Sequence, residues 1–479
     1  MNYIDGRWIS ASGTKTFKSI NPANIDEVLG EFPLSSKEDV DLAVASAKKA
    51  QKEWKRIPAP ERGKLLFNIA RIMEKEKTKL AETITKEMGK TFNESLGEVQ
   101  ISIDMVYYSA GEGRRLIGET VPSEKKDKYI VYFRESVGVA GIITPWNFPL
   151  LLPVRKIMPA LIAGNTVVFK PSRETPLTAQ RFVEILEEAG LPPGVVNLIQ
   201  GSGESAGMEI VKHPDVGVVS FTGSVETGRK IGAICGEQIK KVGLELGGKN
   251  PVIVLEDANI ELALEGCVSG AFGASGQKCT AVSRIIIEEK VYNEFVERFI
   301  ERVKKIKVGN GMDKDVDMGP LVSESQLNKV KYYVELGEKE RARRVYGGKV
   351  LNEGVFSKGF FFEPTVFVEV TPNMRIAKEE IFGPVVCIMK AKNFEDAIDI
   401  ANSTEYGLSA SIYTKDLKKS VKAMELLDVG VVYVNAPPTG AEINGPFGGV
   451  KASGNGEREQ GTIAIDLFTE WKTAFIVLG

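Results

Sequence analysis

The feature that most limits how this chain can fold is an alternation of short apolar segments with amphipathic helical segments. Four apolar runs follow one another with helical periodicity between them: Val137 to Ile143, Asn165 to Lys170, Val195 to Ile199 and Val216 to Phe221. Short apolar runs between helices are typical of parallel strands that are covered on both faces. The pattern therefore predicts an α/β fold on a parallel sheet, the usual scaffold for a nucleotide.

The length of the chain, 479 residues, is too great for one compact core, so we expect more than one domain. A second α/β run extends from 250 to 412, with a buried strand at Arg284 to Ile287 and a helix at Tyr292 to Lys305. The first hundred residues are expected to be mainly helical. A Ser-x-x-Asp capping box opens a helix over Ser36 to Lys55, and two further helical stretches fill 59 to 117.

The charge and the cysteines exclude several classes of protein. With 62 basic and 64 acidic residues the net charge is -2, which gives no reason to expect a nucleic-acid partner. Residues Met1 to Asp5 do not begin a secretory leader, and no apolar run approaches a membrane span. Four cysteines without a C-x-x-C spacing indicate free thiols, with no disulfide framework and no metal site. We expect a cytoplasmic protein that binds neither membrane nor metal.

Candidate catalytic groups are a cysteine and a carboxylate. The single histidine, His213, lies in a turn between a helix and a strand, so the base is expected to be a carboxylate instead. Glu245 precedes a double glycine in an apolar segment, where burial would raise its pKa, although an acid there could also pair with a lysine. Cys279 follows Lys278 and Gly276, which favours an accessible thiolate, yet most lone cysteines are inert core residues.

A phosphate site is indicated only weakly by glycine patterns. The chain has no G-x-G-x-x-G loop, and the nearest match at Gly203 fails because residue 206 is alanine. Phe221-Thr222-Gly223-Ser224 instead closes a strand and opens a helix, whose N-terminus can bind a phosphate. The alternative for this turn is a helix cap and nothing more.

Taken together, seven segments in order along the chain resemble the aldehyde dehydrogenase superfamily from end to end. They are Thr144 to Pro149, Lys170 to Ser172, Phe221 to Ser224, Glu245 to Lys249, Gly276 to Cys279, Glu380 to Pro384 and Pro446 to Gly454. The resemblance implies a Rossmann-type cofactor domain (1–117 and 138–247), a second α/β catalytic domain (248–450) and a β-strand oligomerisation arm (118–137 and 463–479). In that arm, strands would pair at Lys128 to Glu135 and Leu467 to Ile476. Such an exposed extension is stable when another subunit covers it, so we expect a homodimer or homotetramer.

The resemblance also implies a mechanism for oxidising an aldehyde to a carboxylic acid. Cys279 would attack the aldehyde to give a thiohemiacetal, and Asn147, with the backbone N–H of Cys279, would form the oxyanion hole. Glu245 would then activate the water that hydrolyses the thioester, and Lys170 is placed in the catalytic set as well. The intact Glu245 favours a free acid; the alternatives are a coenzyme A-acylating enzyme, an esterase that uses no nicotinamide, and a non-catalytic protein of this fold.

For the cofactor, the resemblance implies NADP as the preferred dinucleotide, with NAD accepted less well. Strict NAD users carry a glutamate three residues after the position of Lys170, where this chain has Arg173, although the neighbouring Glu174 could still turn inward. The residues expected to contact the dinucleotide are Ile143, Thr144, Pro145, Trp146, Lys170, Ser172, Arg173, Gly203, Phe221, Thr222, Gly223, Ser224, Leu246, Gly247, Glu380 and Phe382.

The substrate is indicated least clearly. Pro438 to Ile443 resembles family members that oxidise semialdehydes such as 2-oxoglutarate semialdehyde. Lys278 and Arg155 could bind the distal carboxylate of such a substrate, or they could be structural, as a solvated loop charge and a helix-surface cation. A small aliphatic aldehyde is the alternative substrate.

Overall fold

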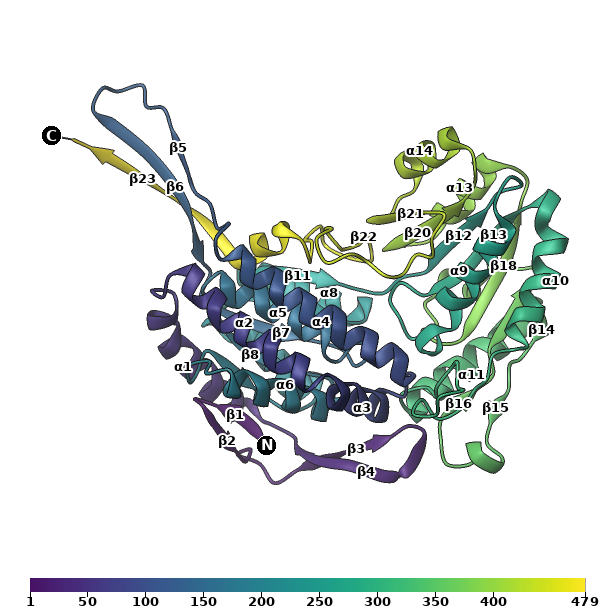
Figure 1. Cartoon of the computed structure of the whole chain (residues 1–479), viewed down its shortest axis with the longest axis horizontal. Helices are drawn as coiled ribbons and strands as arrows, with labels where there is room; N and C mark the ends of the chain where they lie inside the picture. The colour runs from purple at the N-terminus through teal and green to yellow at the C-terminus, as the bar shows by residue number, and fades with distance from the viewer. Residues whose placement is uncertain (479) are drawn as a thin grey trace.

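The computed structural model describes residues 1 to 478 and contains two seven-stranded sheets side by side (Figure 1). The first sheet has the order β11-β10-β7-β8-β9-β1-β2, and its first five strands are parallel. The four predicted apolar runs are confirmed as strands of this sheet. The parallel strands are β7 (Val139–Ile143), β8 (Thr166–Lys170), β9 (Val196–Leu198), β10 (Val216–Thr222) and β11 (Lys241–Glu245).

The expectation of a mainly helical N-terminal region is wrong for the first 33 residues. There β1 (Asn2–Ile4) and β2 (Arg7–Ile9) extend the edge of the first sheet, and β3 (Thr16–Asn21) pairs with β4 (Asn24–Pro33) as an antiparallel hairpin. These strands are short or largely exposed, so they lack the continuous apolar run that identifies a buried strand.

Three helices, where two were expected, follow the capped helix α1 (Lys37–Trp54): α2 (Ala59–Lys75), α3 (Lys77–Met88) and α4 (Phe92–Glu112). The Ser36 capping box is confirmed. Gly89 ends α3 in a left-handed conformation at φ 92°, and a second capping box at Thr91 starts α4, so these two helices are separate.

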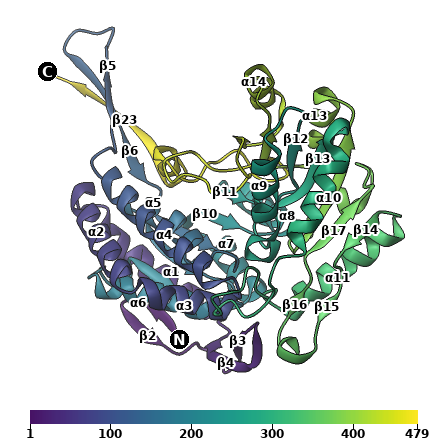
Figure 2. The same ribbon diagram turned by 45° about the vertical axis from the view of Figure 1, so that its right-hand side comes forward.

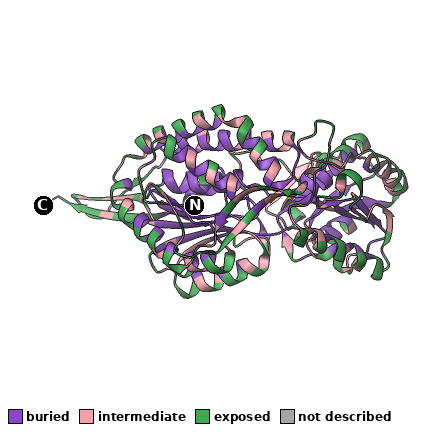
Figure 3. Cartoon of the chain, turned by 90° about the horizontal axis from the view of Figure 1, so that it is seen from below, coloured by how far each residue is buried: buried purple, intermediate pink, exposed green. Residues whose placement is uncertain are grey.

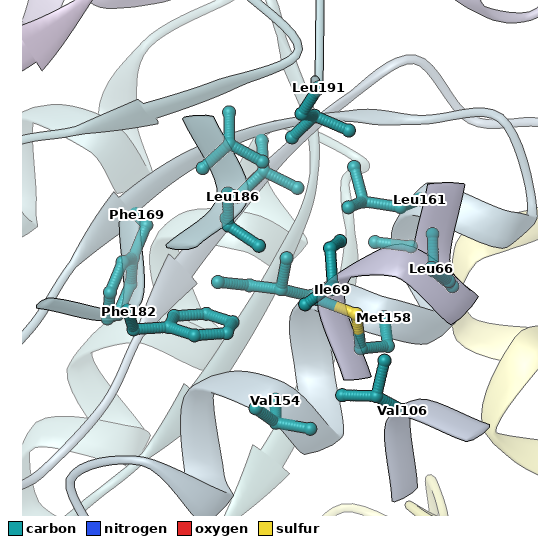
Figure 4. Packing of buried hydrophobic residues seen from close by; sticks show 14 of the residues in the cluster. Leu66, Ile69, Val106, Val154, Met158, Leu161, Phe169, Phe182, Leu186 and Leu191 are labelled. Carbon is teal, nitrogen blue, oxygen red and sulfur yellow. The ribbon is translucent and has the colours of Figure 1, made fainter. Parts of the chain in front are cut away.

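Helices cover both faces of the first sheet, whose strands are buried (Figure 3). Because side chains alternate along β7, Ile142 faces a core shared with α2, α4, α5 (Leu151–Ile162) and α6 (Pro176–Glu188), seen in Figure 4. Ile143 faces the opposite core, shared with α1, α7 (Met208–Lys212) and α8 (Val225–Glu237). A π-helical turn, Gly203–Gly207, leads into α7.

The second sheet has the order β14-β17-β18-β13-β12-β20-β21, with only β14 antiparallel. The strand predicted at 284–287 is confirmed as β13 (Val282–Glu288), and the helix predicted at 292–305 as α10 (Tyr292–Val303). The strands of the second sheet are β12 (Asn250–Val254), β13 (Val282–Glu288), β14 (Arg343–Tyr346), β17 (Thr365–Val368), β18 (Val385–Ala391), β20 (Ser409–Tyr413) and β21 (Val431–Val434).

The helices around this sheet pack into two cores. On one face lie α9 (Ile260–Phe272) and α10 (Tyr292–Val303). On the other lie α11 (Glu324–Lys339), α12 (Arg375–Lys378), α13 (Phe394–Asn402) and α14 (Leu417–Leu426). Small pairs and 3₁₀ turns complete the chain: β15 (Val350–Leu351) with β16 (Phe361–Phe362), β19 (Tyr406–Gly407) with β22 (Val450–Lys451), and turns at Gly273–Gly276, Glu289–Val291, Gly354–Phe356 and Thr462–Phe468.

A three-stranded sheet projects from the part of the molecule built on the first large sheet, at the upper left of Figure 1 and again in Figure 2. It consists of β5 (Glu119–Val121), β6 (Lys128–Ser136) and β23 (Thr469–Val477), so the predicted pairing of the two arm segments is confirmed. Residue 479 of the expected arm lies outside the described residues. Trp471 and Phe475 are 52% and 62% exposed, so the arm presents an apolar surface.

Candidate active site

A cleft of about 270 Å³ lies where the first sheet faces the second, and the predicted catalytic cysteine lines it. The first sheet contributes the loops after β7, β10 and β11, and the second contributes the Cys279 segment and the turn around Glu380. Predicted residues that line the cleft are Pro145, Trp146, Asn147, Thr222, Gly223, Ser224, Leu246, Gly247, Cys279, Glu380 and Phe382. Eleven scattered sequence positions thus converge on one site.

The topology of the first sheet explains this convergence. Strand order reverses at β7, because β8 and β9 follow on one side of it and β10 and β11 on the other. Open α/β sheets bind ligands beside the carboxyl ends of the strands at such a switch point. Ile143 is in register with Lys170 and with Phe221, and Thr222 with Glu245, so these strand-end residues form one row along the carboxyl edge.

The backbone before Cys279 is unusual. Ala274, Ser275 and Gly276 have φ values of 50°, 57° and 68°, the left-handed region that residues with a side chain seldom adopt. A Cβ on Gly276 would lie 2.2 Å from the carbonyl oxygen of Gly383, so glycine is required there. Such strained segments persist where the surrounding structure holds them, often at functional sites.

The thiol of Cys279 is partly exposed to the cleft, but its electrostatic surroundings differ from the expectation. Desolvation by the surrounding protein raises the pKa of this thiol to about 12. Lys278 is not among the residues that line the cleft; its ammonium group lies beside Glu94, and its charge also interacts with Cys279. The first positive charge that lowers the pKa of Cys279 is that of Arg155. Arg155, and not the flanking Lys278, therefore has the larger effect on the thiolate.

Arg155 lies on α5 and lines the cleft, so it is not the surface cation considered as an alternative. Its guanidinium is 4.6 Å from the ring centre of Phe447 and 3.8 Å from Glu459. Glu459 is bonded to the neighbouring Lys156 as well, so part of the charge of Arg155 remains available to a ligand. Lys278, by contrast, is half-buried and does not line the cleft.

Asn147 is buried in the loop after β7, with 3% of its surface exposed. Its side-chain nitrogen donates a hydrogen bond to the carbonyl oxygen of Gln277, at 3.1 Å, and Lys90 donates to its backbone oxygen, at 2.7 Å. The side-chain oxygen has no partner among the described residues. The amide is therefore fixed beside the Cys279 segment and keeps a second N–H for another acceptor.

Glu245 ends β11, directly before Leu246 and Gly247 of the cleft wall. Its carboxylate lies against Gly448, where a Cβ would be 2.6 Å from the nearer oxygen. In residues 1 to 478 neither of its oxygens has a hydrogen-bond partner. Burial, and next the charge of Glu459, raises the pKa of Glu245 well above its ordinary value. This environment is that of a carboxyl group able to exchange a proton near neutral pH.

The other end of the cleft fits a dinucleotide. Glu380 accepts a hydrogen bond from the backbone amide of Gly248 at 2.8 Å, and the rings of Trp146 and Phe382 meet edge to face at 5.4 Å. A Cβ on Gly247 would lie 2.6 Å from the Glu380 carboxylate, so the wall has room only for backbone. Ser224 caps α8, and the N-terminus of this helix opens on the cleft. Thr222 Oγ1 lies beside it and has no partner among the described residues, so this turn could accept a phosphate.

Seven predicted cofactor contacts do not line this cleft: Ile143, Thr144, Lys170, Ser172, Arg173, Gly203 and Phe221. They lie farther along the carboxyl edge or in the loops beyond it. Lys170 is buried, donates to the carbonyl oxygen of Pro171 at 2.7 Å, and has its pKa lowered to about 8 by burial. Arg173 is exposed, and Glu174 accepts a hydrogen bond from Ser172.

Three polar residues of the cleft were not predicted: Thr280, next to Cys279, and Gln326 and Lys329. Gln326 and Lys329 lie on α11 and line the cleft near Glu380, whose charge acts on Lys329. Gln326 donates to the carbonyl oxygen of Phe382 at 2.7 Å. In the sequence, only the spacing of three residues that places Gln326 and Lys329 on one face of a helix could have indicated them. That spacing occurs in most helices, so it does not identify a site.

The remaining polar candidates lie elsewhere. His213 caps α7 at the turn before β10, where its Nδ1 accepts a hydrogen bond from the backbone of Asp215, so it is the expected turn residue. Cys235, Cys267 and Cys387 are buried. Across the described part of the chain, no group of three or more His, Cys, Asp or Glu residues is arranged to hold a metal ion. Among its helices, none is long and apolar enough to cross a membrane.

Comparison with known proteins agrees with this geometry, since the model of the aldehyde dehydrogenase family matches residues 8–474. The chain belongs to the aldehyde dehydrogenase family. It is 42% identical to alpha-ketoglutaric semialdehyde dehydrogenase of Bacillus subtilis, over 99% of this chain and 98% of the relative. It is 43% identical to 2,5-dioxopentanoate dehydrogenase of Saccharolobus solfataricus, over 98% of each.

Among solved aldehyde dehydrogenases, betaine aldehyde dehydrogenase of Staphylococcus aureus in complex with NAD⁺ superposes with a TM-score of 0.97. The two are 37% identical, over 99% of this chain and 94% of that one. The predicted family, fold class and oxidoreductase function are thereby confirmed. The relatives differ in the aldehyde that their names state, so family membership alone does not identify the substrate.

Proposed function

We propose that this aldehyde dehydrogenase oxidises an aldehyde to the carboxylic acid with NAD(P)⁺ and uses Cys279 as its nucleophile. The observation that carries the proposal is the convergence of Cys279, Asn147 and Glu380 on one cleft. The Cys279 thiol gives its proton to solvent, and the thiolate attacks the carbonyl carbon; the C–S bond forms, the C=O π bond opens and a thiohemiacetal oxyanion results. When bound, the nicotinamide provides the acceptor for the hydride that this carbon loses, and a thioester remains on Cys279.

Asn147 stabilises the oxyanion. One of its two N–H groups is bonded to Gln277, which fixes the amide, and the other is free to donate to the substrate oxygen, together with the backbone N–H of Cys279. Because the amide is already held in place, no reorganisation is needed when charge develops.

Glu245 is the general base that activates water to hydrolyse the thioester. Its raised pKa, caused first by burial, suits proton exchange near neutral pH. The free acid is then released. The second candidate is transfer of the acyl group to coenzyme A, which an intact base at this position disfavours. The resemblance implies both a catalytic role for Lys170 and a contact with the adenosine ribose. We assign it to the ribose, and its position beyond the cleft lining supports this assignment.

The substrate is a semialdehyde whose distal carboxylate binds Arg155. Arg155 is a buried cation on the cleft wall, and a guanidinium pairs with a carboxylate through two hydrogen bonds. Two relatives are named for alpha-ketoglutaric semialdehyde and 2,5-dioxopentanoate, which are the same compound, and they support 2-oxoglutarate semialdehyde. The apolar side chains of Ile101, Phe148 and Leu151 also suit a small aliphatic aldehyde, the second candidate.

NADP is the proposed preferred cofactor, and NAD is accepted. Arg173, exposed beyond the end of β8, offers a cation to the 2′-phosphate, while Glu174 is engaged with Ser172. The NAD⁺ complex of the Staphylococcus aureus enzyme supports use of NAD as well. The exposed apolar arm supports a homodimer or homotetramer, and we place the protein in the cytoplasm.

The test is a product analysis with 2-oxoglutarate semialdehyde, glyceraldehyde and isobutyraldehyde, each with NADP⁺ or NAD⁺, in the presence and absence of coenzyme A. We expect NADPH and free 2-oxoglutarate in equal amounts, with no effect of coenzyme A. Formation of an acyl-coenzyme A would instead establish the second candidate function, and activity on isobutyraldehyde alone would establish the second candidate substrate.

A further inference from the structure

The first two turns of α4 contact both segments that form the catalytic side of the cleft. Glu98 Oε1 accepts hydrogen bonds from the backbone amides of Leu150 and Leu151, at 2.9 Å and 3.1 Å, directly after the Asn147 loop. Glu94, one turn earlier, accepts from the backbone amide of Ala274 at 2.6 Å, in the strained segment before Cys279. One helix therefore holds a segment from each domain.

Lys90 completes this connection from the loop before α4. Its ammonium group donates to Glu98 Oε2 and to the backbone oxygen of Asn147, both at 2.7 Å, and lies 4.0 Å from the ring centre of Phe148. The side chains of Lys90 and Glu98 are 1% and 0% exposed. A buried ion pair is weak evidence for stability, because desolvation offsets the attraction, but it does fix geometry.

We propose that Lys90 and Glu98 are positioning residues that fix the Asn147 to Leu151 segment so that the Asn147 amide is aimed at the substrate oxygen. Glu94 holds the Cys279 side of the same gap from the same helix. The proposal rests on the proposed role of Asn147 as the oxyanion donor. Neither Lys90 nor Glu98 lines the cleft, so both act through Asn147 and not by contact with substrate.

The physical reason is the sensitivity of a catalytic hydrogen bond to placement. A misplacement of about 1 Å can lower the rate of a reaction by about a hundredfold. The backbone of Asn147 is held by Lys90, while its side chain is held by Gln277. Loss of the Lys90 contact leaves the backbone oxygen buried without its donor and lets the loop move relative to Cys279.

The choice of variant follows from the charges. Lys90→Met alone would leave the buried Glu98 carboxylate without its cation, which can prevent folding. Lys90→Met combined with Glu98→Gln removes both charges, keeps an acceptor oxygen for Leu150 and Leu151, and still removes the donor to Asn147. The matched control is Lys86→Met on α3, because Lys86 pairs with Glu27 at an exposed site remote from the cleft.

The experiment is a double-mutant cycle with Asn147→Ala. We expect the Lys90→Met/Glu98→Gln enzyme to lose about tenfold in kcat, with KM for aldehyde and Kd for dinucleotide within about twofold. Alkylation of Cys279 by iodoacetamide, which forms no oxyanion, should keep its rate. In the Asn147→Ala background the same pair of changes should lower kcat by less than about twofold, because both act on one interaction.

A tenfold loss that persists in the Asn147→Ala background, or wild-type kcat in the Lys90→Met/Glu98→Gln enzyme, would overturn the positioning proposal. Wild-type kcat in Asn147→Ala itself would instead refute the oxyanion role on which it rests. If the charge-free enzyme does not fold, Glu94→Ala enters the same cycle, since Glu94 is half-exposed. Its loss frees the Ala274 side and the capping box at Thr91, and it leaves the contacts of Lys90 and Glu98 with the Asn147 to Leu151 segment in place. The same lack of additivity is expected, and additive losses would again overturn the proposal.

Discussion

The side-chain amide of Asn147 donates a hydrogen bond to the carbonyl oxygen of Gln277, 3.1 Å away. Asn147 follows β7 of the first sheet, whereas Gln277 belongs to the segment that leads into β13 of the second. The bond therefore joins segments from the two large sheets two residues before Cys279. Any movement of one sheet relative to the other therefore changes the distance between the proposed oxyanion donor and the proposed nucleophile.

Replacement of Gly247 should weaken dinucleotide binding. In Gly247→Ala the new Cβ would lie 2.6 Å from the Glu380 carboxylate, so Glu380 must leave its bond to the Gly248 amide. Loss of one charged hydrogen bond predicts a Kd about tenfold higher, measured by quenching of protein fluorescence. The control is Gly236→Ala on α8, where the new Cβ would meet no described atom within 4 Å outside its own helix backbone and chain neighbours. An unchanged Kd in Gly247→Ala would remove Glu380 from the cofactor site.

Arg155→Met should discriminate between substrates. Loss of a buried charged hydrogen-bond donor predicts a drop of about ten- to a hundredfold in kcat/KM for 2-oxoglutarate semialdehyde. Isobutyraldehyde, which has no carboxylate, should change by less than about threefold, and initial rates with the two aldehydes at one pH provide the comparison. Equal losses for both aldehydes would mean that Arg155 acts on Cys279 or Glu245 and does not bind the substrate.

Arg173→Glu should reverse the cofactor preference. A glutamate beside the adenosine ribose would repel the 2′-phosphate and could accept hydrogen bonds from ribose hydroxyls, so the ratio of kcat/KM for NADP⁺ over NAD⁺ should fall at least about tenfold. Arg181→Glu on the exposed face of α6 makes the same change in net charge away from this loop. If both variants shift the ratio equally, the effect is one of total charge and Arg173 does not contact the cofactor.

The pH dependence of acid release should report Glu245. Burial raises the pKa of this carboxyl group, so its basic form is present above that raised pKa and is lost as pH falls through it. Steady-state turnover should therefore decline on the acid side with an apparent pKa well above that of an ordinary glutamate. Glu245→Gln should abolish this limb and lower turnover by about a hundredfold or more.

Stopped-flow measurement of cofactor reduction separates the two steps in Glu245→Gln. Because Glu245 acts after reduction of the cofactor, a burst of about one equivalent per site should persist before the slow steady state. Loss of the burst together with turnover would place Glu245 in the acylation step.

Much of the fold follows from the sequence, because the parallel strands are continuous apolar runs such as Val139–Ile143, buried on both faces. The β3–β4 hairpin was missed, since it is stabilised by pairing between largely exposed strands and shows no apolar face. The third helix within 59–117 was also missed, because the helix ends there are not marked in the sequence. At Gly89, for example, a glycine within a helical pattern is tolerated in most helices, and only its φ of 92° identifies it as a terminus.

The site was predictable where residues lie at strand ends, since the register of Ile143, Lys170 and Phe221 is a consequence of parallel pairing. The direction of the Lys278 side chain was not predictable, because the sequence does not determine toward which side of a strained loop a side chain points. Gln326 and Lys329 were missed for a related reason. They reach the cleft only through packing of α11 against the Phe382 turn, a contact between segments more than 50 residues apart.

The most direct test of the proposed mechanism is intact-protein and peptide mass spectrometry of enzyme quenched during the burst, with aldehyde and NADP⁺, for Glu245→Gln and for Glu245→Gln/Cys279→Ala. We expect a single acyl group, the aldehyde less one hydrogen in place of the thiol hydrogen, on the peptide that contains Cys279. The Cys279→Ala enzyme should carry no adduct and reduce no cofactor. Cofactor reduction without Cys279, or an adduct on another residue, would contradict the assignment of Cys279 as the nucleophile.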